Sequence, residues 1–317
     1  MKIVIIDGFA LNSGDLSWEP IQQLGEVKVY NRTDHNQIVE RIRDAEVVLT
    51  NKVPMTRESM LQLPNLKYIG VTATGYDVID ILAAKELGIR VTNVSGYSTD
   101  AVAQHTFALL LDITNRVALH NAKVEQGKWS SAKDFTFRSA PLITLKGKTM
   151  GLLGYGDIAS QVARIAKSFG MKVIAHRHTP EKHTDKEVKL KSIEALFAES
   201  DVLSLHAPMN DATEGIVNKG TLALMKKSAY LINTARGGLI NEKDLADALK
   251  NDIIAGAGLD VLSSEPPKAN HPLIGLENCV ITPHIAWSFQ EVRKVLIDLV
   301  AKNLKAFQQG EALNVIV

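Results

Sequence analysis

The chain has 317 residues, of which 45% are hydrophobic and 22% are charged. This length is enough for two domains with cores of their own, and this composition is ordinary for a globular enzyme. The formal net charge is +1, so bulk electrostatics give no argument for nucleic acid or an anionic membrane, and we expect neither as a partner.

Residues 1 to about 98 alternate short apolar runs, which predict strands, with helical patterns. The predicted strands are Ile3–Ile6, Val27–Val29, Val47–Leu49, Tyr68–Val71 and Arg90–Thr92. The predicted helices are Gln37–Arg43, Arg57–Leu61 and Val78–Leu87. Alternation of this kind predicts a parallel sheet covered by helices, which binds ligands at the carboxyl ends of its strands.

Two loops at such strand ends are candidate ligand-binding loops, namely Asn51–Pro54 and Thr72–Asp77. Gly75 in the second loop would let backbone N–H groups face an anion. A plain strand-to-helix turn with Asp77 as the N-cap explains the second loop equally well.

One long helical pattern runs from Thr99 to about Gln126. A helix of this length after a complete α/β unit predicts a crossover into a second domain. The segment 128–140 then indicates an ordered loop, whose three aromatic residues we expect to pack locally.

A dinucleotide-binding fingerprint occupies the centre of the chain. The apolar run Met150–Leu153 leads into Gly154, Gly156 and Ala159, which form a Gly-x-Gly-x-x-Ala pattern. A helical pattern and a second apolar run, Val173–Ala175, follow. Strand, tight turn, helix and strand are the context that this fingerprint requires. Gly154 permits the turn, Gly156 lets backbone approach a pyrophosphate, and the helix N-terminus attracts phosphate.

The residue just beyond the second strand of such a unit faces the adenosine ribose, and an acid there favours NAD. This chain has Arg177 at that place, 23 positions after Gly154, with His178 and Thr179 next to it. A guanidinium suits a 2′-phosphate, so we expect NADP to be preferred over NAD. The alternative is that Arg177 only stacks on adenine and either cofactor serves.

The second half of the chain continues the alternation. Its predicted strands are Asp201–Leu205, Ala229–Ile232, Ile253–Leu259 and Cys279–Ile281. Its predicted helices are Ile193–Phe197, Glu242–Leu249 with Asn241 as N-cap, and Gln290–Gln308, which we expect to pack on the first domain. The single Cys279 cannot form an intramolecular disulfide, and no apolar stretch approaches the ~20 residues of a membrane span, so we expect a cytoplasmic protein.

Polar residues follow successive predicted strands in this half of the chain. They are His206, Thr234, Arg236, Asp260 and His284, with Glu265 in the loop after Asp260. Reduction of a 2-oxo acid by a nicotinamide needs a cation for the substrate carboxylate, a proton donor for the carbonyl oxygen and a carboxylate that orients the donor. Arg236, His284 and Glu265 fit these three roles, and we expect no metal.

The chain resembles the D-isomer-specific 2-hydroxyacid dehydrogenases over nearly its full length. The matching motifs are Gly-Leu-Leu-Gly-Tyr-Gly-Asp-Ile-Ala (151–159), Leu-His-Ala-Pro (205–208) followed by Thr213, Asn-Thr-Ala-Arg-Gly-Gly (233–238), Gly-Leu-Asp-Val (258–261) with Glu265-Pro266, and Thr-Pro-His-Ile-Ala (282–286). The resemblance implies an α/β protein with two doubly wound parallel-sheet domains. A flavodoxin-like substrate domain would comprise 1–98 and 289–317, and a Rossmann dinucleotide-binding domain would comprise 99–288.

The resemblance also implies the site residues. Arg236 would anchor the substrate carboxylate, Glu265 would orient His284, and His284 would be the acid/base. The substrate contacts would be Thr74, Gly75, Arg236 and His284. The cofactor contacts would be Thr106, Gly154, Tyr155, Gly156, Asp157, Ile158, Arg177, His178, His206, Ala207, Pro208, Thr213, Thr234, Ala235, Arg236, Asp260, His284 and Ala286. A homodimer would form through the helix at 99–126.

Within the family, the run from Gly96 to Thr106 and the loop from Phe135 to Leu142 look like the glycerate dehydrogenase (hydroxypyruvate reductase) branch. The resemblance therefore implies an NAD(P)-dependent oxidoreductase that reduces hydroxypyruvate or glyoxylate. A D-lactate or branched 2-oxo acid reductase is the rival enzyme. A non-catalytic NAD(H)-sensing interaction protein is the rival of another class, which the intact set of Arg236, Glu265 and His284 disfavours.

Overall fold

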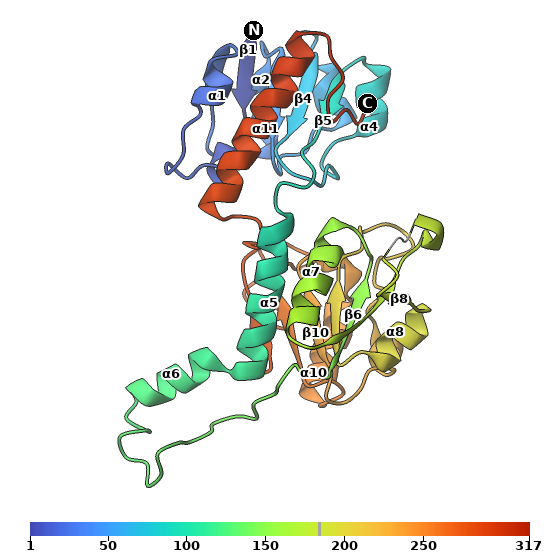
Figure 1. The fold of residues 1–317 in the computed structure, drawn as a ribbon. Coiled ribbons are helices and arrows are strands. Elements are labelled where there is room, and N and C mark those ends of the chain that lie inside the picture. The colour runs from blue at the N-terminus through green and yellow to red at the C-terminus, as the bar shows by residue number, and fades with distance from the viewer. Residues whose placement is uncertain (183–184) are drawn as a thin grey trace. The chain divides into compact units, whose positions relative to one another are not determined.

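The computed structural model describes residues 1–182 and 185–317. The chain divides into two compact units (Figure 1). Unit 1 comprises Met1–Ser98 and Trp287–Val317, and unit 2 comprises Thr99–Ala286. Each unit is built on one parallel sheet with helices packed against it, which confirms the predicted α/β class with two doubly wound parallel sheets.

Unit 1 contains a five-stranded sheet in the order β2-β1-β3-β4-β5, in which all neighbouring strands are parallel. This is the flavodoxin-like strand order. The strands are β1 (Lys2–Ile5), β2 (Glu26–Val29), β3 (Val47–Thr50), β4 (Tyr68–Val71) and β5 (Arg90–Thr92). The helices are α1 (Glu19–Gln22), α2 (Ile38–Ile42), α3 (Arg57–Leu61), α4 (Ile81–Glu86) and α11 (Gln290–Gln308), with 3₁₀ turns η1 (Gly8–Ala10) and η2 (His35–Gln37).

Both faces of this sheet are buried, because alternate residues of each strand point to opposite sides. Val4 and Ile6 pack with α2 and α4 on one face. Ile3 and Ile5 pack on the other face with Leu11, Tyr68 and the apolar side of α11, which the sequence predicts to pack here. In Figure 1, α11 lies across the sheet of its own unit.

Unit 2 contains a seven-stranded parallel sheet in the order β12-β11-β10-β9-β6-β7-β8. The strands are β6 (Thr149–Leu153), β7 (Lys172–His176), β8 (Lys189–Leu190), β9 (Val202–Leu205), β10 (Tyr230–Asn233), β11 (Gly256–Leu259) and β12 (Cys279–Ile281). The helices are α5 (Thr99–Asn115), α6 (Val117–Glu125), α7 (Asp157–Ser168), α8 (Ile193–Glu199), α9 (Lys219–Leu222) and α10 (Glu242–Lys250), with 3₁₀ turns η3 (Pro180–Lys182) and η4 (Gly237–Leu239).

The chain of unit 2 runs outward from β6 in two directions. It first adds β7 and β8 on one side, then returns to add β9 to β12 on the other. This is the Rossmann order extended by one strand, and its topological switch point lies between β6 and β9. Ligands of such sheets bind outside the carboxyl ends of the strands at that point.

The prediction of one helix from Thr99 to Gln126 is wrong. Arg116 has a left-handed backbone conformation, with φ of 51°, and separates α5 from α6. Its guanidinium donates a hydrogen bond to the carbonyl of Glu277 at 2.8 Å, which anchors the break to the loop before β12. The apolar stripe of α5 is buried as far as Ile113, whereas α6 has no buried residue.

Two local expectations have opposite outcomes. Asn241 caps α10, because its side chain accepts a hydrogen bond from the amide of Asp244 at 3.1 Å. Asp77 does not cap a helix, since α4 begins later and Asp80 is its N-cap, accepting from the amide of Ala83 at 2.9 Å. Among the helices of residues 1–182 and 185–317, none combines the length and apolarity that crossing a membrane requires.

Candidate active site

The turn after β6 has the shape that a dinucleotide phosphate needs. Gly154 has φ of 90°, and a Cβ there would lie 2.7 Å from the carbonyl oxygen of His206. Gly156 is the N-cap of α7, and a Cβ on it would meet nothing within 4 Å. Ala159 is fully buried, so α7 packs closely against the sheet. The turn therefore leaves backbone N–H groups at a helix N-terminus open to an anion, which fits a pyrophosphate.

The segment after β7 carries the predicted determinant of cofactor choice. Arg177 is half-buried, and its Nε donates to the hydroxyl of Thr179 at 3.3 Å. The hydroxyl of Tyr155 donates to a carboxylate oxygen of Asp185 at 2.6 Å, and burial together with this carboxylate raises the pKa of Tyr155. Tyr155 thus ties the phosphate-binding turn to the segment beyond η3.

The end of β9 brings a neutral imidazole next to this turn. Burial lowers the pKa of His206 to about 4, and its Nε2 lies 2.9 Å from the hydroxyl of Ser204. The hydroxyl of Thr213 donates to the carbonyl of Pro208 at 2.7 Å and closes the loop that follows. His206 is therefore uncharged at neutral pH and is a hydrogen-bonding group rather than a cation.

The end of β10 presents Arg236 on a rigid turn. The buried Asn233 holds this turn by accepting from the amide of Ala235 at 3.0 Å and donating to the carbonyl of Arg236 at 2.9 Å. Thr234 shares a 3.1 Å hydroxyl contact with Thr106, which lies on α5 and is fully buried. Because hydrogen bonds hold the backbone on both sides of Arg236, its side chain starts from a defined position at the end of β10.

The loop after β12 is organised by a buried carboxylate. One oxygen of Asp260 accepts from the hydroxyl of Thr282 at 2.6 Å and from the amide of Ile285 at 2.9 Å. The other oxygen accepts from the amide of Ala286 at 2.9 Å. Nε2 of His105 lies 2.9 Å from the hydroxyl of Thr282 and 3.4 Å from Asp260. Burial alone would raise the pKa of Asp260, but these hydrogen bonds outweigh it and hold the pKa below its usual value.

His284 stands at the tip of that loop beside Glu265. The Nδ1 atom of His284 lies 2.6 Å from Oε2 of Glu265, whose Oε1 accepts from the amide of Leu262 at 3.1 Å. His284 has φ of 54°, a left-handed conformation held by hydrogen bonds from its amide to the carbonyls of Asp260 and Thr282. Its Nε2 has no protein partner in the part of the chain that the structure describes. A carboxylate at Nδ1 and an open Nε2 suit transfer of a proton to or from a reactant.

Gly237 places the turn of Arg236 against the turn of Glu265. A Cβ on Gly237 would lie 1.9 Å from the carbonyl carbon of Leu262 and 2.3 Å from the amide nitrogen of Ser263. Only a residue without a side chain allows the two backbones to approach so closely. Unit 2 thus gathers Arg236, Glu265 and His284 at the carboxyl edge of one sheet.

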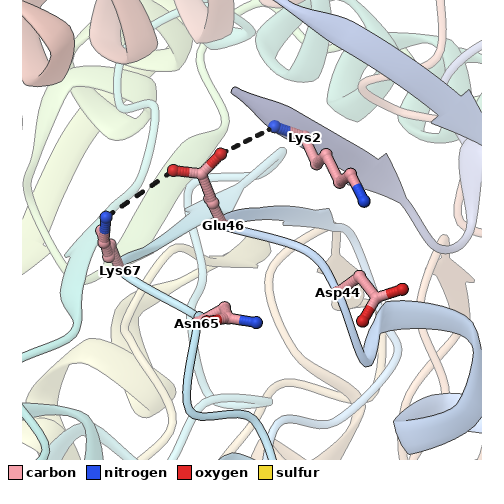
Figure 2. A pocket seen from close by; sticks show the side chains of 5 residues that line it. All are labelled: Lys2, Asp44, Glu46, Asn65 and Lys67. Carbon is pink, nitrogen blue, oxygen red and sulfur yellow. Dashed lines mark hydrogen bonds and ion pairs between the residues drawn. The ribbon is translucent and has the colours of Figure 1, made fainter.

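The remaining predicted contacts fall in two places. Thr74 and Gly75 belong to unit 1, in the loop after β4, where Asn93 donates to the carbonyl of Thr74 at 2.6 Å. The others in unit 2 are the exposed Asp157, His178 and Pro208, the partly buried Ile158 and Ala235, and the buried Ala207 and Ala286. Within unit 1, a polar pocket lies at the amino ends of β1, β3 and β4 (Figure 2), at the opposite edge of the sheet from the loop of Thr74 and Gly75. It is lined by Lys2, Asp44, Glu46, Asn65 and Lys67.

Sequence reasoning missed the side chains that support the predicted ones. His105 and Thr282 attach to Asp260, and Asp185 attaches to Tyr155. Thr282 lies in the Thr-Pro-His-Ile-Ala motif, but the sequence does not indicate what its side chain contacts. His105 lies more than 150 positions from its partners. No spacing rule in the sequence connects residues that far apart.

Comparison with known proteins identifies similar chains along the full length. The family model for the D-isomer specific 2-hydroxyacid dehydrogenase NAD binding domain matches residues 107–286. The hydroxypyruvate reductase of Blautia hydrogenotrophica is 46% identical, and the alignment covers 100% of this chain and 99% of that protein. The glycerate dehydrogenase of Methylorubrum extorquens is 39% identical, with 99% and 98% covered. The solved NADPH-dependent glyoxylate/hydroxypyruvate reductase of Sinorhizobium meliloti, in complex with NADP and malonate, is 29% identical with a TM-score of 0.86, and 100% and 96% of the two chains are covered.

Proposed function

Because this chain belongs to the D-isomer-specific 2-hydroxyacid dehydrogenase family, we propose that it reduces hydroxypyruvate or glyoxylate to the 2-hydroxy acid with a nicotinamide dinucleotide. The observation that carries the proposal is the 2.6 Å contact between His284 and Glu265 at the edge of a dinucleotide-binding sheet. A sensor protein without catalysis has no need for an imidazole held in this way, with its second nitrogen open.

The roles of the three side chains follow from their chemistry. The guanidinium of Arg236 holds the substrate carboxylate with two parallel hydrogen bonds and draws electron density from the adjacent carbonyl. Nε2 of His284 gives its proton to the carbonyl oxygen during reduction and takes it back during oxidation. Glu265 stabilises the protonated ring through Nδ1 and fixes its orientation. The bound nicotinamide supplies or accepts the hydride, and Thr74 and Gly75 are proposed further contacts for the carboxylate.

We propose NADP(H) as the preferred cofactor. The support is Arg177, which directly follows β7 at the position of the adenosine ribose in this fold. The Sinorhizobium meliloti relative was solved with NADP, which is consistent with this preference. The carboxylate of Asp185 accepts a hydrogen bond from the hydroxyl of Tyr155.

We also propose a homodimer formed through α5 and α6, and a cytoplasmic location. The support for the dimer is α6, in which no residue is buried and Val117 is 63% exposed. The support for the location is the single cysteine, Cys279, which cannot form an intramolecular disulfide.

A panel of 2-oxo acids tests the proposed function. The oxidation of NADPH and NADH is followed by absorbance with hydroxypyruvate, glyoxylate, pyruvate and 2-oxoisocaproate. We expect hydroxypyruvate and glyoxylate to give higher kcat/KM than the other two acids. A preference for pyruvate or 2-oxoisocaproate would change the proposed substrate but not the proposed type of reaction. The absence of turnover with every acid would favour a cofactor-sensing protein.

A further inference from the structure

A second histidine–carboxylate pair lies beside the proposed catalytic pair in unit 2. Nε2 of His271 lies 2.9 Å from Oε2 of Glu242, the first residue of α10. The two side chains are 9% and 14% exposed, so both are largely withdrawn from water. Neither residue belongs to a motif that the sequence singles out, and the reaction described above does not use them.

The hydrogen bonds around this pair indicate which ring nitrogen of His271 carries a proton and that Glu242 is ionised. The amide of Leu273 donates to Nδ1 of His271 at 3.4 Å, so in the neutral ring Nε2 carries the proton and donates to Glu242. Burial acts to raise the pKa of Glu242, but hydrogen bonds from Ser263 and His271 outweigh it and hold the pKa below its usual value. Glu242 is therefore a carboxylate at neutral pH.

The carboxylate of Glu242 holds the turn that contains Glu265 through hydrogen bonds. The amide of Ser263 donates to Oε1 of Glu242 at 2.7 Å, and the hydroxyl of Ser263 donates to Oε2 at 2.5 Å. The preceding residue, Leu262, donates its amide to Glu265 at 3.1 Å, and Glu265 in turn contacts His284 at 2.6 Å. A continuous line of hydrogen bonds and covalent bonds thus runs from α10 to the imidazole.

We propose that Glu242, held by His271, is a positioning residue for the Glu265–His284 pair. Hydrogen bonds to a charged acceptor are stronger than neutral ones, and two of them on a single residue restrict both its translation and its rotation. Because Glu265 is fixed through the neighbouring amide of Leu262, movement of Ser263 changes the distance from Glu265 to His284. This inference rests on the proposed function, in which Glu265 orients the ring of His284 for proton transfer.

The test uses the full-length enzyme and three variants. Glu242→Gln keeps an acceptor for the amide of Ser263 but cannot accept from both its hydroxyl and His271. Ser263→Ala removes only the hydroxyl, and Ser263→Thr restores one. We expect Glu242→Gln and Ser263→Ala to lower kcat for hydroxypyruvate reduction by about tenfold, because small misplacements of a catalytic group are costly. Ser263→Thr should return most of the loss, and KM for NADPH should stay within about twofold of wild type.

The pH profile separates positioning from a general loss of structure. Reduction consumes the protonated ring, so its rate falls as pH rises through the midpoint of His284. A looser Glu265 favours the protonated ring less, and the midpoint therefore moves to lower pH. In Glu265→Gln the carboxylate is lost altogether, so this variant should show the largest shift of the pH midpoint. Glu242→Gln should show a smaller shift in the same direction. The charged or titratable groups that the contacts above place around His284 in unit 2 are Glu265, Asp260, His105 and Arg236, and these variants leave the last three unchanged.

Asp244→Asn provides the matched control. Asp244 lies in the same first turn of α10 and accepts a hydrogen bond from another element, the amide of Lys219, at 2.9 Å. This variant removes the same charge from the same helix end without touching Ser263. It should keep the wild-type kcat and pH midpoint.

A second readout does not depend on turnover. The ring of His284 is titrated by NMR in wild type, Glu242→Gln and Ser263→Ala, and its signal is assigned by its loss in a His284→Asn variant. Wild-type midpoints and kcat in both variants would overturn the proposal, as would an equal effect of Asp244→Asn. If wild type reduces none of the oxo acids, the proposed function fails, and the NMR midpoints still decide whether Glu242 positions the pair. If Glu242→Gln does not fold, Ser263→Ala decides.

Discussion

Arg236 illustrates how little freedom a single side chain has at this site. Its backbone is held by the buried Asn233, and its guanidinium donates to the carbonyl of Ala235 at 2.8 Å. Arg236→Lys keeps the charge but loses the planar fork that matches a carboxylate. We expect KM for the oxo acid to rise by about ten- to a hundredfold, with cofactor KM nearly unchanged, as initial rates will show. Wild-type values for both constants would remove Arg236 from the substrate site.

Arg177 is the residue that we propose sets the choice of cofactor. Arg177→Asp replaces a charge that attracts a 2′-phosphate with one that repels it and accepts hydrogen bonds from a ribose. We expect kcat/KM with NADPH to fall by at least about a hundredfold, while the value with NADH stays equal or rises. The measurement is kcat/KM with both cofactors in both proteins. A wild type that prefers NADH, together with a variant that shifts neither value, would show that Arg177 does not read the 2′ position.

His206 makes stability depend on pH in a defined direction. Burial lowers its pKa from 6.5 to about 4, so between these values the unfolded chain binds more protons than the folded one. The free energy of unfolding therefore falls as pH drops from 7 towards 4, by on the order of 2 kcal/mol from this residue. His206→Asn should lose less stability on acidification, measured by urea midpoints at pH 7 and 4.5. Replacing the exposed His35 by Asn serves as the control and should leave the acid loss unchanged.

At the scale of elements, η4 packs closely against the turn at 262–263, since a Cβ on Gly237 would lie 1.9 Å from the carbonyl carbon of Leu262. Gly237→Ala forces these backbones apart, and such overpacking costs about 1–3 kcal/mol. We expect a fall in Tm of several degrees and a loss of kcat, because Arg236 and Glu265 both move. In the adjacent Gly238→Ala, the added Cβ would lie 2.4 Å from the sulfur of Met209, near the end of a flexible side chain that can move, so this substitution should cost much less. Equal effects of the two substitutions would contradict this explanation.

Strands and helices were predictable from sequence wherever local chemistry decides them. The strands of unit 1 are short apolar runs with the predicted positions, and Asn241 caps α10 because an Asn before a helical pattern is a strong local signal. The break at Arg116 was not predictable, because no Gly or Pro marks it and the carbonyl that its guanidinium contacts lies 161 positions away in the sequence. The start of α4 was missed since two acids, Asp77 and Asp80, compete as caps and the sequence does not rank them.

The candidate site was predictable only in part, for a related reason. Arg236, Glu265 and His284 each follow a strand, and parallel topology brings such positions to one edge of a sheet. Glu242 and His271 follow no strand end and are connected to the site only through the fold. A residue that acts through hydrogen bonds to a backbone leaves no sequence spacing to recognise.

For the whole molecule, α6 and the loop after it carry the proposed dimer contacts. They project from the sheet of their own unit (Figure 1), and Trp129 and Phe135 are 53% and 89% exposed. Val117→Asp places a charge on this apolar surface, so we expect a monomer where wild type is a dimer, measured by light scattering after gel filtration. Leu82→Asp on α4, at a residue that is 73% exposed, is the control and should leave the mass unchanged. A dimeric Val117→Asp protein would place the interface elsewhere.

The division of unit 1 between the two ends of the chain has a consequence for biosynthesis. The apolar face formed by Ile3, Ile5 and Tyr68 is covered by α11, and Val91 at the edge of the sheet exchanges backbone hydrogen bonds with Ile316 and Val317. The ribosome synthesises residues 99–286 before residues 290–317. The N-terminal part of unit 1 therefore emerges first, and its sheet stays uncovered until α11 follows. Nascent chains that are stalled through a linker after residue 289, long enough to span the ribosomal exit tunnel, should therefore hold a protease-resistant unit 2 beside a protease-sensitive N-terminal segment. This is the stage at which a chaperone is most needed.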